Sequence, residues 1–372
     1  MKISLERAQL LKALAHVQSV VERRNTIPIL SNVLLQATDG KLALTATDLD
    51  IEVVETVAAN VGQGGSTTAP AHVLYDIVRK LPEGSEVSLD HDSATERLEI
   101  RAGRSRFSLA TLPKDDYPAM SAGDMTHRFQ VAGAAIKTLI DKTRFAISTE
   151  ETRYYLNGIF LHTMDVNGAP VLRAVATDGH RLARVELPAP DGAAGMPGII
   201  FPRKAVGEIR KLIDDVEGDV AVAVSDTKIR FSMGSVVFTS KLIDGTFPDY
   251  QRVIPSGNDK RLAVDTAAFS ASVDRVSTVS SEKSRAVKMA LEDGRLTLSV
   301  TSPDSGSATE EMEVEYAGGS MEIGFNARYL LEIASQIGSD TAVFELQDAG
   351  SPTVVHDDGT STALYVLMPM RV

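Results

Sequence analysis

The 372-residue sequence contains no cysteine, which excludes both a disulfide framework and a metal site built on thiolates. It also has no run of 18 apolar residues, so we expect no membrane-spanning helix. Its first residues, MKISLERAQLLKAL, carry charges throughout and lack the apolar core of a secretory signal. These absences predict a soluble, cytoplasmic protein.

The common sequence motifs of enzymes are missing as well. The chain contains no phosphate-binding glycine loop, no GxGxxG fingerprint, no HExxH and no GxSxG. Its seven histidines are scattered, and no two of them have the spacing of metal ligands. We therefore expect no cofactor, no bound metal ion and no catalytic residues.

A repeat of about 130 residues is the most informative feature that the sequence does contain. Three features recur: a Thr-Asp pair after an apolar run, a proline before a helical pattern, and a phenylalanine four residues after a glycine. The recurring positions are Asp48 and Asp178, 130 apart, Pro70 and Pro202, 132 apart, and Phe107 and Phe238, 131 apart. A fainter third copy follows, with LTLSVTSPD at 296–304 and FNARYLLEIASQI at 325–337. A repeat this long is a domain in its own right, so we predict three similar domains, at 1–124, 125–254 and 255–372.

Each copy has the same order of predicted elements, namely a strand, an amphipathic helix, short alternating strands, a second helix and further strands. The predicted helices are 5–24, 71–81, 133–145, 202–213, 266–285 and 326–337. The first strands are predicted at 3–5, 29–36, 41–47 and 51–57. Since strands dominate and short turns join them, the sheets should be mainly antiparallel and the fold class α+β.

Charge is distributed unevenly between the helices and the rest of the chain. A net charge of −12 by itself argues against binding to nucleic acid. The six predicted helices nevertheless carry +9, which leaves −21 for the remaining residues. Arg203 and Lys204 stand at a helix start, where the helix dipole does not favour cations, so they indicate a phosphate partner. The alternative is that these are ordinary solvated helix faces.

Carboxylates supply the best argument for an enzyme. Asp48 and Asp50 lie two residues apart on one strand, and Asp178 repeats the position of Asp48. Such residues could hold Mg²⁺ in a metal-dependent nuclease or phosphotransferase. Each repeated aspartate precedes a predicted turn, however, where its side chain commonly bonds to the backbone. We therefore favour a structural role, and Mg²⁺-dependent cleavage would distinguish the two.

Two further segments suggest a binding function. ATDGHRL at 176–182 is a dense polar cluster between apolar strands, and the chain ends in the apolar segment LYVLMPMRV at 364–372. The final segment could be a last core strand, but methionine also suits adaptable peptide-binding surfaces.

Six strings, in order along the whole chain, resemble the family of bacterial DNA polymerase III beta subunits, the replicative sliding clamps. They are RNTIPILSN (24–32), AGRSRFSL (102–109), TRYYLNGIF (152–160), VATDGHRLA (175–183), TSKLIDGTFPDY (239–250) and MPMR (368–371). The resemblance implies the DNA clamp fold, with three similar domains that each carry two helices on antiparallel sheets. It also implies a head-to-tail homodimer, a closed ring of six domains whose helices surround double-stranded DNA without sequence preference. Such a ring is a non-catalytic processivity factor.

The resemblance also implies DNA-contacting residues. The matching positions are Arg24, Tyr154, Tyr155, Arg203 and Lys204. The sequence departs from the family at Glu150, where relatives carry an uncharged polar residue that reaches DNA. A carboxylate should weaken that contact, so Glu150 is left out of the predicted site.

A second site implied by the resemblance is a hydrophobic pocket between the central and C-terminal domains. It receives short peptide motifs of the DNA polymerase III alpha subunit, the clamp loader delta subunit and other DNA enzymes. Its matching residues are Leu156, Thr177, Gly179, His180, Arg181, Leu182, Pro248, Arg252, Val253, Val366, Leu367, Met368, Pro369, Met370 and Arg371.

The third implied site is the joint of the ring. The matching residues are Arg104, Arg106, Phe107, Leu109, Thr278 and Val279. The arginines are expected to face acidic residues such as Glu310, Glu311 or Glu313. Thr278 is more polar than the family pattern, which should weaken the joint, and the alternative for Phe107 and Leu109 is plain core packing.

Overall fold

The computed structural model describes all residues except 122, 281–284 and 360–361. The chain forms two compact units. Unit 1 contains Met1–Lys137, Pro190–Pro197 and Lys204–Leu242, and unit 2 contains Thr138–Ala189, Gly198–Arg203 and Ile243–Val372. In the described part of the chain, no helix is long and apolar enough to cross a membrane.

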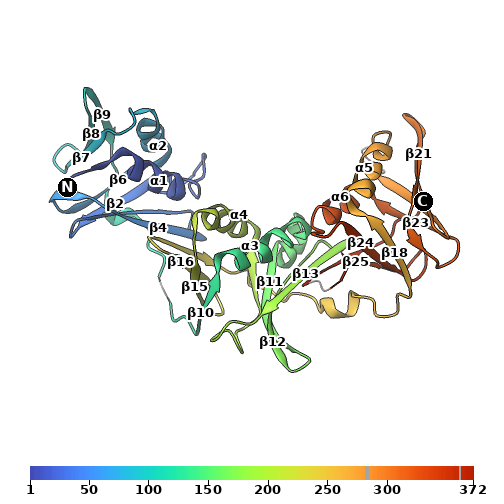
Figure 1. Cartoon of the computed structure of the whole chain (residues 1–372). Coiled ribbons are helices and arrows are strands. Elements are labelled where there is room, and N and C mark those ends of the chain that lie inside the picture. Colours follow the sequence, from blue (N-terminus) through green and yellow to red (C-terminus); the bar gives the residue numbers. More distant parts are fainter. Residues whose placement is uncertain (122, 281–284, 360–361) are drawn as a thin grey trace. The chain divides into compact units, whose positions relative to one another are not determined.

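Unit 1 contains two antiparallel sheets (Figure 1). The five-stranded sheet has the order β5-β1-β7-β8-β9, and the eight-stranded sheet has the order β10-β15-β16-β17-β4-β3-β2-β6. The strands are β1 (Lys2–Glu6), β2 (Asn32–Thr38), β3 (Lys41–Thr47), β4 (Ile51–Ala58), β5 (Asn60–Gln63), β6 (Gly65–Pro70), β7 (Glu86–Asp92), β8 (Arg97–Ala102), β9 (Ser105–Ala110), β10 (His127–Ala132), β15 (Asp219–Val224), β16 (Lys228–Met233) and β17 (Val236–Lys241).

Unit 2 also contains two antiparallel sheets. The nine-stranded sheet has the order β14-β11-β12-β13-β26-β25-β24-β18-β22, and the four-stranded sheet has the order β21-β20-β19-β23. The strands are β11 (Gly158–Val166), β12 (Ala169–Thr177), β13 (Arg181–Pro188), β14 (Ile199–Pro202), β18 (Lys260–Asp265), β19 (Ala286–Glu292), β20 (Arg295–Ser302), β21 (Gly306–Glu313), β22 (Glu315–Tyr316), β23 (Met321–Asn326), β24 (Thr341–Leu346), β25 (Thr353–Asp357) and β26 (Ala363–Leu367).

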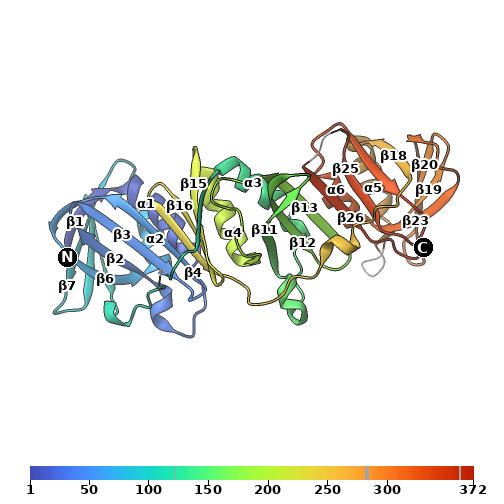
Figure 2. The ribbon, with the colours of Figure 1, turned by 90° about the horizontal axis from the view of Figure 1, so that it is seen from below.

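The described residues form six α-helices and several short 3-10 helices. The α-helices are α1 (Arg7–Gln18), α2 (Ala71–Lys80), α3 (Gly133–Asp141), α4 (Arg203–Leu212), α5 (Thr266–Ser277) and α6 (Ala327–Ala334). The 3-10 helices are η1 (Pro28–Ser31), η2 (Lys114–Asp116), η3 (Arg144–Ala146), η4 (Glu151–Leu156), η5 (Ile213–Asp215) and η6 (Tyr250–Val253). Figures 1 and 2 show α1 beside α2 in unit 1 and α5 beside α6 in unit 2.

Apolar residues at helical spacing place the helices on the sheets. In α1, Leu10, Leu14 and Val17 are buried, and the helix contacts β3 and β4. Helices α5 and α6 begin with capping side chains: Ala268 N donates to Asp265 at 2.7 Å and Arg328 N to Asn326 at 3.0 Å. The predicted α+β class, with two helices and antiparallel strands in each repeat, is confirmed.

The observed helices are shorter than predicted. Helix α1 ends at Gln18 and not at residue 24. Ser19 Oγ donates a hydrogen bond to the carbonyl oxygen of His16 at 2.7 Å, and this bond competes with the backbone hydrogen bonds that would continue the helix. Helix α5 ends at Ser277, and part of its predicted extension to residue 285 lies outside the described residues. Within the observed bounds the helices carry 11 Lys and Arg against 5 Asp and Glu, a net charge of +6. The basic bias is real but smaller than predicted.

The strand that was predicted at 29–36 also differs, since Pro28 opens the 3-10 helix η1 and β2 begins only at Asn32. Proline lacks the N–H that a strand ladder needs and fixes φ near the helical value. The predictions for β3 and β4 are confirmed to within one residue.

The repeated Thr-Asp pairs form the same turn in both copies. Asp48 Oδ1 accepts hydrogen bonds from Asp50 N at 2.9 Å and Ile51 N at 2.7 Å. Asp178 Oδ1 likewise accepts from His180 N at 2.9 Å and Arg181 N at 3.1 Å. The interpretation of these aspartates as turn residues is therefore confirmed.

A half-buried histidine joins α1 to β4 and η5 within unit 1. His16 Nδ1 lies 2.7 Å from the buried carboxylate of Glu55, and its Nε2 lies 3.3 Å from Asp215. The hydrogen bond with Glu55 raises the pKa of His16 above its ordinary value, although burial opposes the shift. Protonated His16 therefore ties the first repeat to the second.

We expect the free energy of unfolding to fall as pH rises through the raised pKa of His16. Because the folded state binds this proton more tightly than the unfolded state, the stabilisation is complete below pH 6.5 and lost above the folded pKa. A hydrogen bond between charged groups contributes roughly 1.5 to 3 kcal/mol. Urea unfolding between pH 6 and 9 measures the loss. His16→Gln should be less stable at pH 6 and should lack this component. Parallel pH profiles for the two proteins would contradict the assignment.

Candidate functional site

All fifteen residues of the predicted peptide pocket belong to unit 2. Strand pairing explains why segments far apart in sequence meet there: Leu182 of β13 is the partner of Val366 of β26. The same pairing continues into the tail, where Met368 N donates to the carbonyl of His180 at 2.9 Å. The structure therefore brings the polar turn at 177–181 and the apolar C-terminal tail together, as predicted.

The floor beneath this turn is apolar and closely packed. Leu156, Leu182 and Val366 are buried in one cluster. The other buried members of that cluster are Val175, Ile200, Phe247 and Tyr250. Leu367 is fully buried as well. These predicted pocket residues are thus core residues of unit 2.

The exposed apolar surface comes from η6 and the tail. Val253 is 50% exposed, Met368 39% and Met370 37%. Large side chains exposed to this degree are available for an apolar partner. Among the predicted pocket residues, these three are the exposed large hydrophobic side chains.

The tail is held against β23. Met370 N donates to Gly324 O at 2.7 Å, and a Cβ built on Gly324 would lie 2.2 Å from Cγ1 of Val372. Only glycine at 324 lets the tail approach so closely. Beside it lies a cleft of about 550 Å³. The cleft is lined by Glu322, Ile323, Gly324, Ala349, Gly350, Pro369, Met370, Arg371 and Val372.

Arg181 has a different place from the one expected of a pocket residue. Its guanidinium is buried, donates to Phe145 O at 2.6 Å, pairs with Glu332 and lies 4.2 Å from the ring centre of Tyr329. Its Nε also donates to Asp178 at 3.2 Å. Arg181 therefore supports the turn from beneath.

Sequence reasoning missed Arg153, which lies over the turn. A Cβ on Gly179 would be 2.6 Å from Arg153 Nη1, which places the guanidinium directly over this residue. Gly179 has φ +89°, a backbone conformation that favours glycine. Glu150 accepts from Arg153 Nε at 2.8 Å and lies 2.6 Å from its Nη2. That hydrogen bond lowers the pKa of Glu150. The sequence could have predicted this ion pair, because opposite charges three residues apart meet on a helical turn.

The five predicted DNA contacts are divided between the two units. Arg24 is exposed in the irregular segment after α1, not in its last turn as predicted. Tyr154 is 54% exposed, and its ring meets that of Tyr155 edge-on at 5.8 Å. Arg203 is the first residue of α4 and is exposed.

Lys204, the fifth predicted DNA contact, lies beside two carboxylates. Its Nζ is 2.6 Å from Asp48 Oδ2 and also pairs with Glu22. Burial acts to lower the pKa of Lys204, but the bonds to Asp48 and Glu22 raise it above its ordinary value. Its charge is therefore largely compensated within unit 1.

The predicted joint residues lie at one sheet edge, that of β9, and at the end of helix α5, and their expected acidic partners lie on the edge strand β21. Strand β9, with Phe107 and Leu109, is the last strand of its sheet in the described chain, and Phe107 is 37% exposed. Arg106 already has a partner in Glu99 at 2.5 Å, and Glu310 pairs with Arg275. Arg104 lies in the exposed turn before β9. Thr278 and Val279 directly follow α5.

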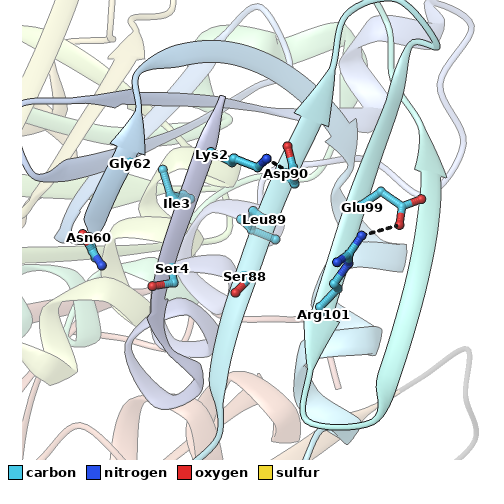
Figure 3. A pocket seen from close by; sticks show the side chains of 10 residues that line it. All are labelled: Lys2, Ile3, Ser4, Asn60, Gly62, Ser88, Leu89, Asp90, Glu99 and Arg101. Carbon is cyan, nitrogen blue, oxygen red and sulfur yellow. Dashed lines mark ion pairs between the residues drawn. The ribbon is translucent and has the colours of Figure 1, made fainter.

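Unit 1 also carries a groove of about 340 Å³ on its five-stranded sheet, which no sequence pattern predicted (Figure 3). Lys2 lies 3.1 Å from Asp90, and Arg101 lies 3.8 Å from Glu99. Both cations of the groove thus face carboxylates, and we assign no ligand to it.

Comparison with known families decides between the interpretations. Models described as the DNA polymerase III beta subunit N-terminal, central and C-terminal domains match residues 1–121, 130–249 and 251–371. The chain belongs to the DNA polymerase III beta subunit family, the sliding clamps. The match covers three domains in order, although the exact domain bounds predicted above stay a prediction.

Individual sliding clamps resemble the chain over its full length. The beta sliding clamp of Caulobacter vibrioides (strain NA1000 / CB15N) is 55% identical over 372 residues, and that of Escherichia coli (strain K12) is 39% identical over 375, each covering 100% of both chains. Among solved structures, the Bartonella birtlesii sliding clamp bound to griselimycin has a TM-score of 0.97 at 54% identity, with 100% of each chain covered. The Caulobacter crescentus sliding clamp has a TM-score of 0.96 at 54% identity, again over 100% of each chain.

Membership of this family settles the class of protein. Sliding clamps are processivity factors of DNA replication, which bind DNA and polymerase partners and are not catalytic subunits. The alternative of a metal-dependent nuclease or phosphotransferase is therefore wrong, and the resemblance stated from the sequence is confirmed.

Proposed function

We propose that the chain closes head to tail with a second copy into a ring of six domains around double-stranded DNA, in the cytoplasm. The ring would tether the DNA polymerase III alpha subunit, the clamp loader delta subunit and other enzymes with short peptide motifs. The observation that carries this proposal is the pair of unfilled sheet edges of opposite charge, β9 and β21.

Charge makes the two edges complementary. Arg104 and Arg106 border β9, and Glu310, Glu311 and Glu313 lie on β21. In the described chain each strand has a neighbour on one side only, so its outer backbone groups can pair with another chain. Within the chain, Arg106 pairs with Glu99 and Glu310 pairs with Arg275. When the two strands pair, contacts across the joint would replace these ion pairs or join them in a network. Exposed Phe107 would be covered at the same time.

The DNA contacts that we propose are weak and independent of sequence. The helices carry a net +6, and several of their cations already face carboxylates, such as Lys12 with Asp215 at 3.1 Å and Lys137 with Asp214 at 2.7 Å. Contacts of Lys and Arg with phosphates carry no sequence information. A protein that slides needs contacts of this kind, and the closed ring would keep it on the DNA.

The pocket of unit 2 is proposed to bind peptide motifs through its exposed apolar rim. Val253, Met368 and Met370 would contact a Leu or Phe of the partner, and polar groups of the turn at 177–181 would fix its backbone. Clamps from Bartonella birtlesii and Pseudomonas aeruginosa have been solved bound to griselimycin. We propose that griselimycin binds this chain in the same pocket.

Phe107→Ala should lower the mass in sedimentation velocity to about half, because it removes an apolar side chain at the centre of the proposed joint. Leu109→Ala should act in the same direction. Val73→Ala, which shortens another exposed side chain on α2, is the matched control and should leave the mass unchanged. If Phe107→Ala sediments like the unmodified chain, the joint has been placed wrongly.

Deletion of residues 368–372 should abolish binding of griselimycin and of the polymerase alpha subunit, since it removes two of the three exposed apolar side chains of the pocket. Titration calorimetry and co-sedimentation measure these losses. The dimer should persist, because the deleted residues lie outside β9 and β21. Normal binding by the truncated chain would refute the pocket assignment.

A further inference from the structure

The wall of the pocket that carries Pro248, Arg252 and Val253 has almost no backbone support. From residue 244 to 259 the chain forms no strand, and its regular structure is limited to η6. A wall without a strand ladder must be held in place by its side chains. Two of them are buried, Phe247 and Tyr250.

Tyr250 is bound to the nine-stranded sheet by its hydroxyl. Arg173 Nη1 donates to Tyr250 Oη at 2.9 Å, and His162 Nε2 lies 2.9 Å from the same oxygen. Arg173 is itself buried and fixed by Glu186, which accepts from its Nε at 2.8 Å and its Nη2 at 2.5 Å. The chain of bonds thus runs from β13 through β12 to η6, and onward to β11.

The direction of these hydrogen bonds follows from the chemistry of the groups. Arginine can only donate, so the Tyr250 oxygen accepts from Arg173 and its proton is available to His162 Nε2. Neutral His162 accepts at Nε2, while its Nδ1 faces the carbonyl of Thr163 at 3.4 Å. Burial, aided by the nearby charge of Arg173, lowers the pKa of His162 and favours this neutral form.

Aromatic packing fixes Phe247, the other buried side chain of this wall. The ring of Phe160 stacks on Phe247 with centres 4.8 Å apart and on His162 with centres 4.7 Å apart. Phe247 and Tyr250 are thereby fixed to the same strand, β11, by different means. Of the two, only Tyr250 uses hydrogen bonds.

We propose that Tyr250 is the residue that positions the 247–253 wall of the pocket, through the bonds of its hydroxyl with Arg173 and His162. This inference rests on the proposed peptide-binding function. Tyr250 does not touch the bound partner in this account. It keeps Val253 and Pro248 at the spacing that the partner requires.

Tyr250→Phe removes the hydroxyl and keeps the ring. The affinity of the full-length chain for griselimycin, measured by titration calorimetry at pH 7.5, should fall about fivefold, the effect of one hydrogen bond. Tyr365→Phe is the matched control, because the buried hydroxyl of Tyr365 has no hydrogen-bond partner among the described residues. That variant should bind like the unmodified chain.

A pH profile separates positioning from a general loss of stability. Besides His162, the charged groups around this hydroxyl are Arg173 and Arg184, and Glu186 is paired with Arg173. The two arginines keep their charge between pH 7.5 and 5. Affinity of the unmodified chain should therefore weaken as His162 becomes protonated below pH 6.5, since His162 then no longer accepts from Tyr250. Tyr250→Phe should lack this weakening.

His162→Gln supplies a second variant, because the glutamine oxygen can still accept from Tyr250 but does not titrate. It should bind nearly as well as the unmodified chain at pH 7.5 and lack the weakening at low pH. The positioning role is contradicted if Tyr250→Phe binds griselimycin with unchanged affinity. It is also contradicted if this variant binds more weakly but keeps the pH profile of the unmodified chain. Neither result contradicts the pocket assignment. The pocket assignment itself is wrong if the unmodified chain does not bind griselimycin, or if the chain that lacks residues 368–372 binds it equally well. The inference about Tyr250 is then wrong as well.

Discussion

The pairing of β13 with β26 is the interaction on which the rest of unit 2 depends. These strands come from different sequence repeats, yet Leu182 and Val366 are neighbours in one continuous antiparallel ladder. The ladder brings the turn after Thr177 next to the tail that begins at Met368. Unit 1 uses the same device, since Phe238 of β17 pairs with Val53 of β4. Repeats joined by backbone hydrogen bonds form long sheets, and in unit 2 the proposed pocket lies where two repeats meet.

Electrostatics in this chain are balanced more closely than its net charge suggests. The helices are basic, but Asp214, Asp215 and Asp48 neutralise some of their cations within unit 1. Few strong phosphate contacts are left, and the affinity for DNA should be correspondingly low and sensitive to salt. Weak contacts suit a protein that must move along the duplex. Retention then has to come from the closed ring that we propose.

Sequence reasoning recovered what depends on local pattern and repetition. The Thr-Asp turns, the six helices and the strands β3 and β4 follow from periodicity and turn chemistry, and the family follows from six matching strings. It could not foresee contacts between side chains that are distant in sequence. Arg181, which was predicted as a pocket residue, is buried and pairs with Glu332, 151 residues away. Lys204, which was predicted to contact DNA, lies beside Asp48. Tyr250 went unnoticed because its partners Arg173 and His162 are about 80 residues away in sequence.

The claim that topology holds the protein on DNA is tested most directly by the shape of the DNA. The chain would be loaded onto a nicked circular plasmid by its clamp loader and then filtered in high salt, before and after one cut that makes the plasmid linear. We predict that the protein stays on the circle and leaves the linear form, because only the circle lacks an end. Equal loss from both forms would contradict encirclement.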